Sequence, residues 1–300
     1  MSLFENDPAH PEGPTGQGAE PSTPVAEAGA TVSFAAPPAT APAASVPPDL
    51  RISWSWAHFV VFLLFGFGSQ FVVVILFSAY LGSVRGYSSK QVEHALTTSA
   101  TFAVAIQLVW FGFLLLFLYV TLSVLRDAPF WSTVGWRSFS GDKSSLRNRL
   151  WPYFFSGCGL SAVVAAAGVR IRPKNNVPIE ELFKDPHSQL MLMAMAVLVA
   201  PLVEETVFRG YLYPFFARKL GVPAGVLLTG TFFGLMHGSQ LGWNWGIVGL
   251  LIFVGVVFTY VRARTGTVLA SYLLHLGYNS LIALAAALAT RGFQQPVPTH

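Results

Sequence analysis

The sequence predicts an all-α protein: a polytopic bundle of seven transmembrane helices, or eight, that follows a disordered N-terminal tail. Hydrophobic residues make up 53% of the 300 residues and charged residues only 11%, whereas roughly a quarter of the residues of soluble proteins are charged. The apolar residues also gather in uncharged runs long enough to cross the ~30 Å hydrocarbon core of a bilayer. Composition and patterning together exclude an ordinary soluble domain.

Residues 1–50 are expected to form a disordered, acidic tail rich in proline and alanine. They hold ten of the 20 prolines and only two aromatic residues, so they cannot bury enough apolar surface to offset the entropy lost on ordering. All 18 lysines and arginines lie from Arg51 onward, mostly between apolar runs, where membrane anchoring explains them better than nucleic-acid binding. We expect the lipid bilayer as a partner and no nucleic acid.

Seven apolar runs give the predicted spans. They are residues 59–81, 99–125, 152–169, 190–207, 222–236, 245–261 and 268–288. The first two form an N-terminal pair within residues 51–128, and the other five form a core at 129–290 before a short C-terminal tail at 291–300. Lysine and arginine are frequent in the loops after the second, fourth and sixth runs, which favours a cytoplasmic N-terminus. We expect a multi-pass protein of the cell membrane.

Small residues within these runs predict helix packing. Gly230, Gly234 and Gly238 are four residues apart and line one helical face, which permits close approach of a neighbouring helix. The single cysteine, Cys158, lies in an apolar run, where it is expected to act as a small packing residue.

Polar groups inside the apolar runs are the candidate functional residues. An ionisable group within a membrane helix costs several kcal/mol unless it is paired or hydrated, so each one predicts a site. They occur in the fourth run, at the end of the fifth and in the seventh. They are Glu204, Glu205, Arg209, His237, His275 and Asn279.

Helical periodicity assigns different environments to the two glutamates. Glu205 and Arg209 are neighbours at positions i and i+4, which predicts a paired clamp, while Glu204 points about a quarter turn away. A buried glutamate without its own cation suits a general base or acid that acts on water. His275 and Asn279 are also four apart, so both could donate hydrogen bonds to one oxyanion.

A metal ion is a second use of the same residues. Glu204, His237 and His275 could form a zinc shell that leaves one position for water. The zinc-protease signature His-Glu-x-x-His is absent, so metal use stays open. An aspartyl mechanism is excluded because every aspartate lies in the tail or a loop, and no serine stands in a setting that indicates a nucleophile.

Three motifs resemble a known family. Residues 204–210 (EETVFRG), 233–237 (FGLMH) and 275–279 (HLGYN) are similar in order and spacing to the motifs of the CAAX-protease and bacteriocin-processing family, called CPBP or Abi. The resemblance covers residues 130–288. It implies that Glu204 and His237 activate a water molecule and that His275 and Asn279 stabilise the oxyanion. It gives supporting roles to Glu205, Arg209 and Phe233. Family members are described as metalloproteases, although a metal-free glutamate mechanism has also been argued.

The leading hypothesis is an intramembrane endopeptidase. Its substrate would be a peptide or lipidated protein, including a prenylated one, cut near its C-terminus or close to the membrane. A transporter that relays protons or ions through Glu204, His237 and His275 is the first alternative. A non-catalytic membrane module of the bacteriocin-immunity type is the second. The sequence contains no internal duplication of the kind found in many transporters.

Overall fold

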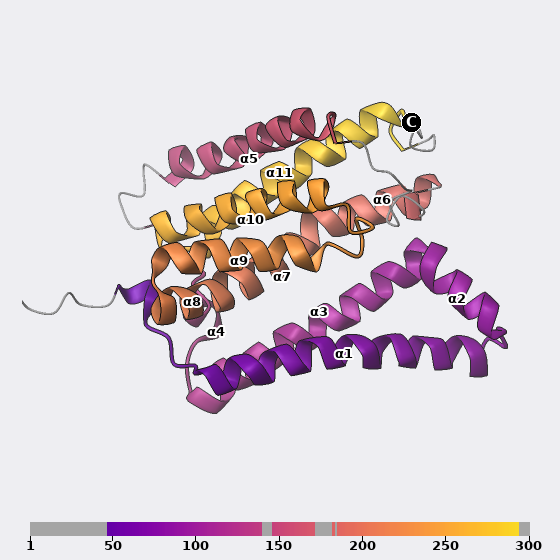
Figure 1. Ribbon diagram of the computed structural model, residues 1–300, viewed down its shortest axis with the longest axis horizontal. Coiled ribbons are helices and arrows are strands. Elements are labelled where there is room, and N and C mark those ends of the chain that lie inside the picture. Colours follow the sequence, from indigo (N-terminus) through magenta and orange to yellow (C-terminus); the bar gives the residue numbers. More distant parts are fainter. Residues whose placement is uncertain (1–46, 140–145, 172–181, 184, 294–300) are drawn as a thin grey trace, which may run out of the picture. The chain divides into compact units, whose positions relative to one another are not determined.

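The all-α prediction is confirmed. In the computed structural model, residues 47–139, 146–171, 182–183 and 185–293 are described, and these residues contain helices and loops but no strand. Residues 1–46, which are most of the predicted tail, and residues 294–300 lie outside the described part of the chain. Figure 1 shows the long helices lying side by side.

Among the described residues, six helical segments are long and apolar enough to cross a membrane, which establishes a multi-pass integral membrane protein. They are α1 (Trp56–Ser83), α3 (Ala100–Leu122) with its short extension to Arg126, α5 (Leu146–Gly168), the segment Pro186–Leu220, α10 (Trp245–Thr265) and α11 (Val268–Ala289). The predicted fifth run forms α9 (Val222–Met236), whose 15 residues are apolar but reach only ~22 Å. Seven spans are therefore counted only if α9 is included. The orientation in the membrane stays a prediction.

The segment Pro186–Leu220 is longer than the predicted span at 190–207. It consists of α6 (Pro186–Ala194), the π-helical turns η5 (Met195–Val199) and η6 (Thr206–Leu212), and the α-helical pieces α7 (Ala200–Glu205) and α8 (Tyr213–Leu220). The helix continues beyond the predicted span, and the charge of Glu205 is paired with Arg209 within the same segment. Two π-helical turns in one helix are unusual and are often associated with functional sites.

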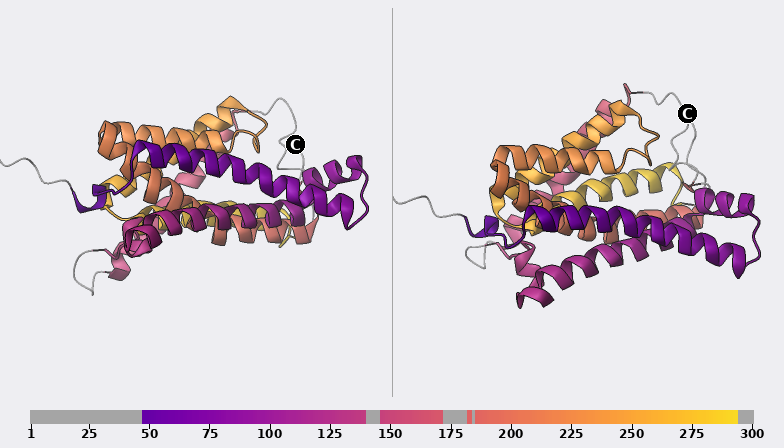
Figure 2. Two further views of the ribbon diagram at one scale, coloured as in Figure 1. Left: turned by 90° about the horizontal axis from the view of Figure 1, so that it is seen from below. Right: turned by 60° about the horizontal axis from the view of Figure 1, so that its bottom comes forward.

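The N-terminal helices α1 and α3 are joined at one end by α2 (Ser89–Thr98), as Figures 1 and 2 show. The span predictions did not include α2, which carries little apolar surface and is stabilised by a capping box between Ser88 and Gln91. Trp110 of α3 donates its indole N–H to the Gly66 carbonyl of α1 at 2.9 Å. Outward-facing side chains such as Leu64 and Phe71 are apolar and about 70% exposed. Apolar side chains are expected on a helix surface that faces lipid.

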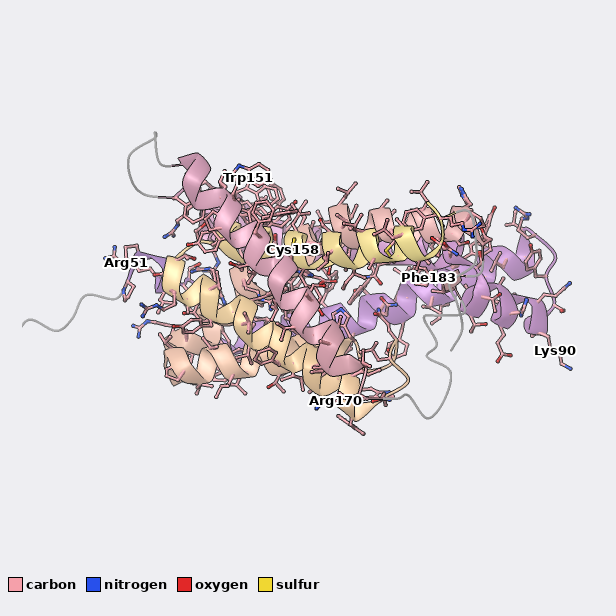
Figure 3. All side chains as sticks on the ribbon, turned by 90° about the horizontal axis from the view of Figure 1, so that it is seen from above. Arg51, Lys90, Trp151, Cys158, Arg170 and Phe183 are labelled. Carbon is pink, nitrogen blue, oxygen red and sulfur yellow. The ribbon has the colours of Figure 1, made fainter. Side chains whose placement is uncertain are left out.

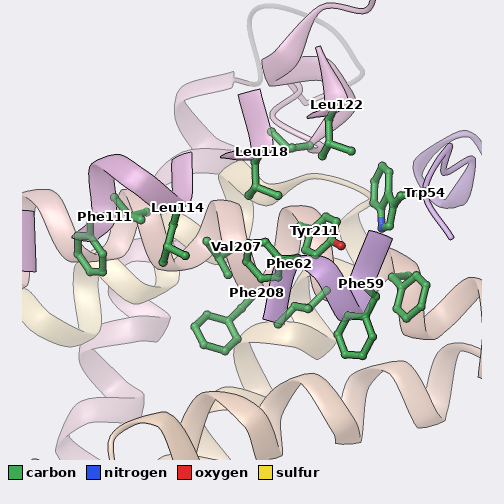
Figure 4. Close-up of a cluster of buried hydrophobic side chains, with 14 of the residues drawn as sticks. Trp54, Phe59, Phe62, Phe111, Leu114, Leu118, Leu122, Val207, Phe208 and Tyr211 are labelled. Atoms are coloured by element: carbon green, nitrogen blue, oxygen red, sulfur yellow. The ribbon is translucent and has the colours of Figure 1, made fainter. Parts of the chain in front are cut away.

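An aromatic cluster attaches α1 to the helix that bears the glutamates (Figure 4). Trp54 stacks on Tyr211 with ring centroids 5.3 Å apart, and Phe62 packs on the other side of the same ring at 4.7 Å. His58 Nδ1 lies 2.7 Å from the Tyr211 hydroxyl. The N-terminal pair is therefore an integral part of the bundle.

The last residues of the predicted tail are part of the described structure and are helical. Pro48–Leu50 form a 3-10 helix, and Asp49 Oδ2 accepts a hydrogen bond from Arg262 Nη1 at 3.1 Å. Arg262, which the sequence analysis placed in a basic loop, lies in the last turn of α10 and is 1% exposed. This pairing joins residues more than 200 positions apart, which local composition cannot reveal.

Glycines set the closest helix contacts, as predicted for Gly230 and Gly234. A Cβ atom on either one would lie within 2.6 Å of the α10 backbone, whereas Gly238 faces Trp243 in the following loop. A tighter contact joins α5 to α11. A Cβ on Gly277 would lie 1.9 Å from the Phe154 carbonyl oxygen.

Cys158 lies at this same crossing of α5 and α11 (Figure 3). Its Sγ is 3.3 Å from the Gly277 carbonyl oxygen, which agrees with the packing role expected for it. A Cβ on the neighbouring Gly157 would lie 1.9 Å from the Leu274 carbonyl oxygen. Both helices therefore require glycine where they cross.

The crossing gives a direct test. Gly157→Ala should destabilise the protein by about 1–3 kcal/mol, because the added methyl group meets backbone atoms that cannot move independently. Gly159→Ala, two residues along the same helix, is the control, since a Cβ there meets nothing within 4 Å. Thermal unfolding in detergent would compare them. Equal melting temperatures for the two variants would contradict the described packing.

Candidate active site

The polar residues predicted from the sequence come together where α7, α9 and α11 meet. Glu204 and Glu205 end α7, His237 follows the last residue of α9, and His275 lies within α11. The Glu204 carboxylate lies between two imidazoles. His237 Nε2 is 4.0 Å from Glu204 Oε1, and His275 Nε2 is 3.8 Å from Glu204 Oε2.

Both imidazoles are oriented through their other nitrogen. His237 Nδ1 lies 2.8 Å from the Phe233 carbonyl oxygen, and His275 Nδ1 lies 3.1 Å from Glu205 Oε1. Because both partners accept hydrogen bonds, each Nδ1 carries the proton and each Nε2 faces Glu204. Separations of 3.8 and 4.0 Å are too long for direct hydrogen bonds, so the arrangement suits a water molecule or a shuttled proton between these groups.

The predicted clamp between Glu205 and Arg209 is present and completely buried. Arg209 Nη1 donates to Glu205 Oε1 at 2.9 Å, and both side chains are 0% exposed. The guanidinium also donates to the Gly255 carbonyl at 2.9 Å and to Thr259 Oγ1 at 3.3 Å, both in α10. Sequence reasoning missed these two partners, because a backbone carbonyl and a threonine in an apolar helix give no distinctive signal.

Aromatic rings complete the surroundings of Arg209. Its guanidinium carbon lies 4.5 Å from the centre of the Phe233 ring and 5.2 Å from that of Phe258. Phe233 also contacts both histidine rings, with centroids 4.9 Å from His237 and 5.8 Å from His275. Phe233, which is expected to have a supporting role, thus lies between the Arg209 guanidinium and the two imidazoles.

Asn279 is placed differently from His275. Its amide Nδ2 donates to the Ala196 carbonyl in η5 at 2.8 Å, one turn along α11 from His275. The two side chains share a helical face, as predicted, but they contact different acceptors in this structure. Asn279 therefore joins the site to the first π-helical turn.

Glu204 and His237 line a cavity of about 290 Å³ that is walled mainly by apolar side chains from α1, α3, η6 and α9. Figure 4 labels five of the lining residues: Phe62, Phe111, Leu114, Val207 and Phe208. Glu204 is 16% exposed, whereas its neighbour Glu205 is fully buried. Of the two carboxylates, Glu204 is thus the one that a bound molecule can reach.

The zinc set of Glu204, His237 and His275 stays a prediction. Among the described residues, no group of three or more histidine, cysteine, aspartate or glutamate side chains is arranged to hold a metal ion. His237 Nε2 and His275 Nε2 both face the Glu204 carboxylate, at 4.0 and 3.8 Å. The mechanism proposed below is written for the side chains of the protein alone.

Comparison with known families identifies the segment that holds the site. Residues 186–281 match the family described as type II CAAX prenyl endopeptidase Rce1-like. This match supports the resemblance to CAAX proteases predicted from the three motifs. The CAAX-protease segment runs from α6 into α11 and includes all three motifs, while α1 to α5 lie outside it. No curated protein and no solved structure matches the chain. The match supports a protease of the CAAX type, and the helices support a membrane location.

The two adjacent glutamates give a matched test of this geometry. Glu205→Gln should destabilise the protein by about 3–5 kcal/mol, because it leaves the buried Arg209 without its carboxylate. Glu204→Gln should change stability little, since Glu204 borders the cavity and has no cation of its own. Thermal unfolding in detergent would measure both, and a larger loss for Glu204→Gln would contradict the assignment.

Proposed function

We propose that the protein is an intramembrane endopeptidase that hydrolyses a peptide bond in a lipidated protein or peptide, near its C-terminus or close to the membrane. The observation that carries the proposal is the position of Glu204. Its carboxylate lies between two imidazoles on the wall of an apolar cavity, inside the segment that matches CAAX prenyl endopeptidases. A transporter or an immunity module would not require this combination.

In the proposed reaction, Glu204 is the general base. A water molecule held between Glu204 and His237 gives a proton to the carboxylate as its oxygen attacks the substrate carbonyl carbon. The negative charge that develops on the carbonyl oxygen is stabilised by the second amide N–H of Asn279 and by His275 in its doubly protonated form, in which Nδ1–H stays on Glu205 and Nε2–H donates to the oxygen. Collapse of the tetrahedral intermediate breaks the C–N bond, and Glu204 returns the proton to the leaving amine. The products are a new carboxylate and a new amine.

The buried groups around Glu204 support this role. Glu205 accepts from both His275 and Arg209, so its charge is already compensated and it is not available as a base. Glu204 has no such partner and faces the cavity. Exclusion of bulk water by the surrounding helices strengthens electrostatic interactions inside the site.

The apolar cavity supports a lipid-modified substrate. A prenyl chain partitions into hydrocarbon, so a prenylated C-terminus could approach from the bilayer and present its peptide bond at the polar end of the cavity. The lining is consistent with this, because most of it is aromatic or aliphatic while Glu204 and His237 mark one polar region.

Replacement of the proposed base is the central test. Glu204→Gln should lower cleavage of a quenched farnesylated CAAX peptide by about 10²- to 10⁴-fold, the usual contribution of general-base catalysis, because the amide cannot accept the proton. Purified protein in lipid vesicles would be assayed, with thermal unfolding measured in parallel. Equal cleavage by wild type and variant would overturn the role of Glu204, and loss of ion flux instead of cleavage would favour a transporter.

A chelator provides a separate test of the metal-free mechanism. Because no step uses a metal ion, prolonged incubation with a strong zinc chelator should leave the cleavage rate unchanged within a factor of about two, a change worth ~0.4 kcal/mol. The comparison is made with the same vesicles and peptide. Loss of activity that added zinc restores would contradict the mechanism and favour Glu204, His237 and His275 as ligands.

A further inference from the structure

The N-terminal helices contribute two carboxamides to the cavity that contains Glu204. Gln70 of α1 and Gln107 of α3 both line it, although these helices lie outside the matched segment 186–281. Both helices are otherwise strongly apolar and suited to crossing a membrane. An amide in the middle of such a helix is costly unless it is hydrogen-bonded, so its placement on the cavity wall requires an explanation.

Of the two glutamines on the cavity wall, Gln70 has an unpartnered buried polar atom. Its Oε1 is buried and accepts no hydrogen bond from any described residue. Two serines of α1, by contrast, are satisfied within their own helix. Ser69 donates to the Gly66 carbonyl at 3.1 Å, and Ser78 donates to the Val74 carbonyl at 2.8 Å. Gln70 therefore combines a place on the cavity wall with an acceptor that no described residue satisfies, which is consistent with a role in binding a ligand.

The wall that carries Gln70 is held firmly in place. One turn before it, the Gly66 carbonyl accepts a hydrogen bond from Trp110, and the Cβ position of Gly66 lies 3.4 Å from Leu114. Two turns before it, Phe62 packs on Tyr211 of the glutamate-bearing segment. Gln70 is thus presented from a rigid helix, fixed relative to the helix that carries Glu204, which favours specific recognition.

We propose that Gln70 recognises the peptide backbone of the substrate, next to the bond that Glu204 attacks. This inference rests on the proposed function. A carboxamide accepts from a peptide N–H and donates to a peptide C=O, so it complements a backbone amide whatever the side chains are. A prenyl chain has no N–H to offer, and the remaining wall is mainly apolar. Gln70 would position the peptide while the apolar wall holds the lipid.

Binding and cleavage are measured separately to test this. A fluorescent farnesylated CAAX peptide is titrated onto Glu204→Gln protein in vesicles, which should bind without turnover, with and without Gln70→Leu. Loss of one or two backbone hydrogen bonds should weaken binding by about 5- to 20-fold. Ser78→Ala, whose hydroxyl bonds only to its own helix, is the control and should leave binding unchanged.

A chemical double-mutant cycle identifies the contact. Peptides in which one backbone N–H at a time is replaced by an ester oxygen should bind less tightly to the protein that retains Gln70. At the position that Gln70 contacts, the ester should not weaken peptide binding further in the protein that carries Gln70→Leu. Additive losses at every position would overturn the proposal and leave Gln70 with an indirect role, such as holding water.

The remaining outcomes separate this proposal from the proposed function. Gln70→Leu should melt at the same temperature as its parent or higher, because an unpaired buried polar atom is removed. A lower melting temperature together with unchanged peptide affinity would assign Gln70 a structural role and overturn the inference, even if wild-type protein cleaves the peptide. Weakened binding without any wild-type cleavage would instead overturn the peptidase function and leave peptide recognition intact.

Discussion

The site depends on how one buried cation is neutralised. Arg209 lies within the bundle with no exposed surface, where an unpaired charge costs several kcal/mol. Glu205 balances its charge, and Gly255 and Thr259 take its remaining hydrogen bonds. These bonds join η6 to α10. Since Glu205 Oε1 also lies 3.1 Å from His275 Nδ1, the same carboxylate orients an imidazole in α11.

This pairing gives the adjacent glutamates different chemistry. One residue along a helix is a rotation of about 100°, so when Glu205 faces Arg209 the Glu204 carboxylate must face elsewhere. It faces the cavity and the two Nε2 atoms. The charge of Glu205 is neutralised by Arg209, so this residue has a structural role. Glu204 has no such partner and can accept a hydrogen bond or a proton from a bound molecule. Of these two adjacent glutamates, Glu205 therefore stabilises the structure and Glu204 is the reactive group in the proposed mechanism.

Features that depend on local spacing could be predicted from the sequence. The Glu205–Arg209 clamp, the glycine face at Gly230 and Gly234, and most spans follow from periods of three to four residues or from length. Features that depend on distant partners could not. The bond from Arg262 to Asp49, the bond from Asn279 to Ala196 and the unpaired Oε1 of Gln70 arise only when separate helices meet.

The position of the motif at residues 204–210, which overlaps the π-helical turn η6, depends on contacts with residues outside the motif. Thr206 accepts a hydrogen bond from the Trp136 indole at 3.0 Å, and a Cβ on Gly210 would lie 2.5 Å from the Val134 carbonyl oxygen. The segment after α4 (Phe130–Thr133) thus packs on η6, while α10 receives Arg209 from the same turn. A turn held by two neighbours cannot rotate freely. Because Glu204 and Glu205 immediately precede η6, contacts at Val134 and Trp136 help fix the direction of both carboxylates.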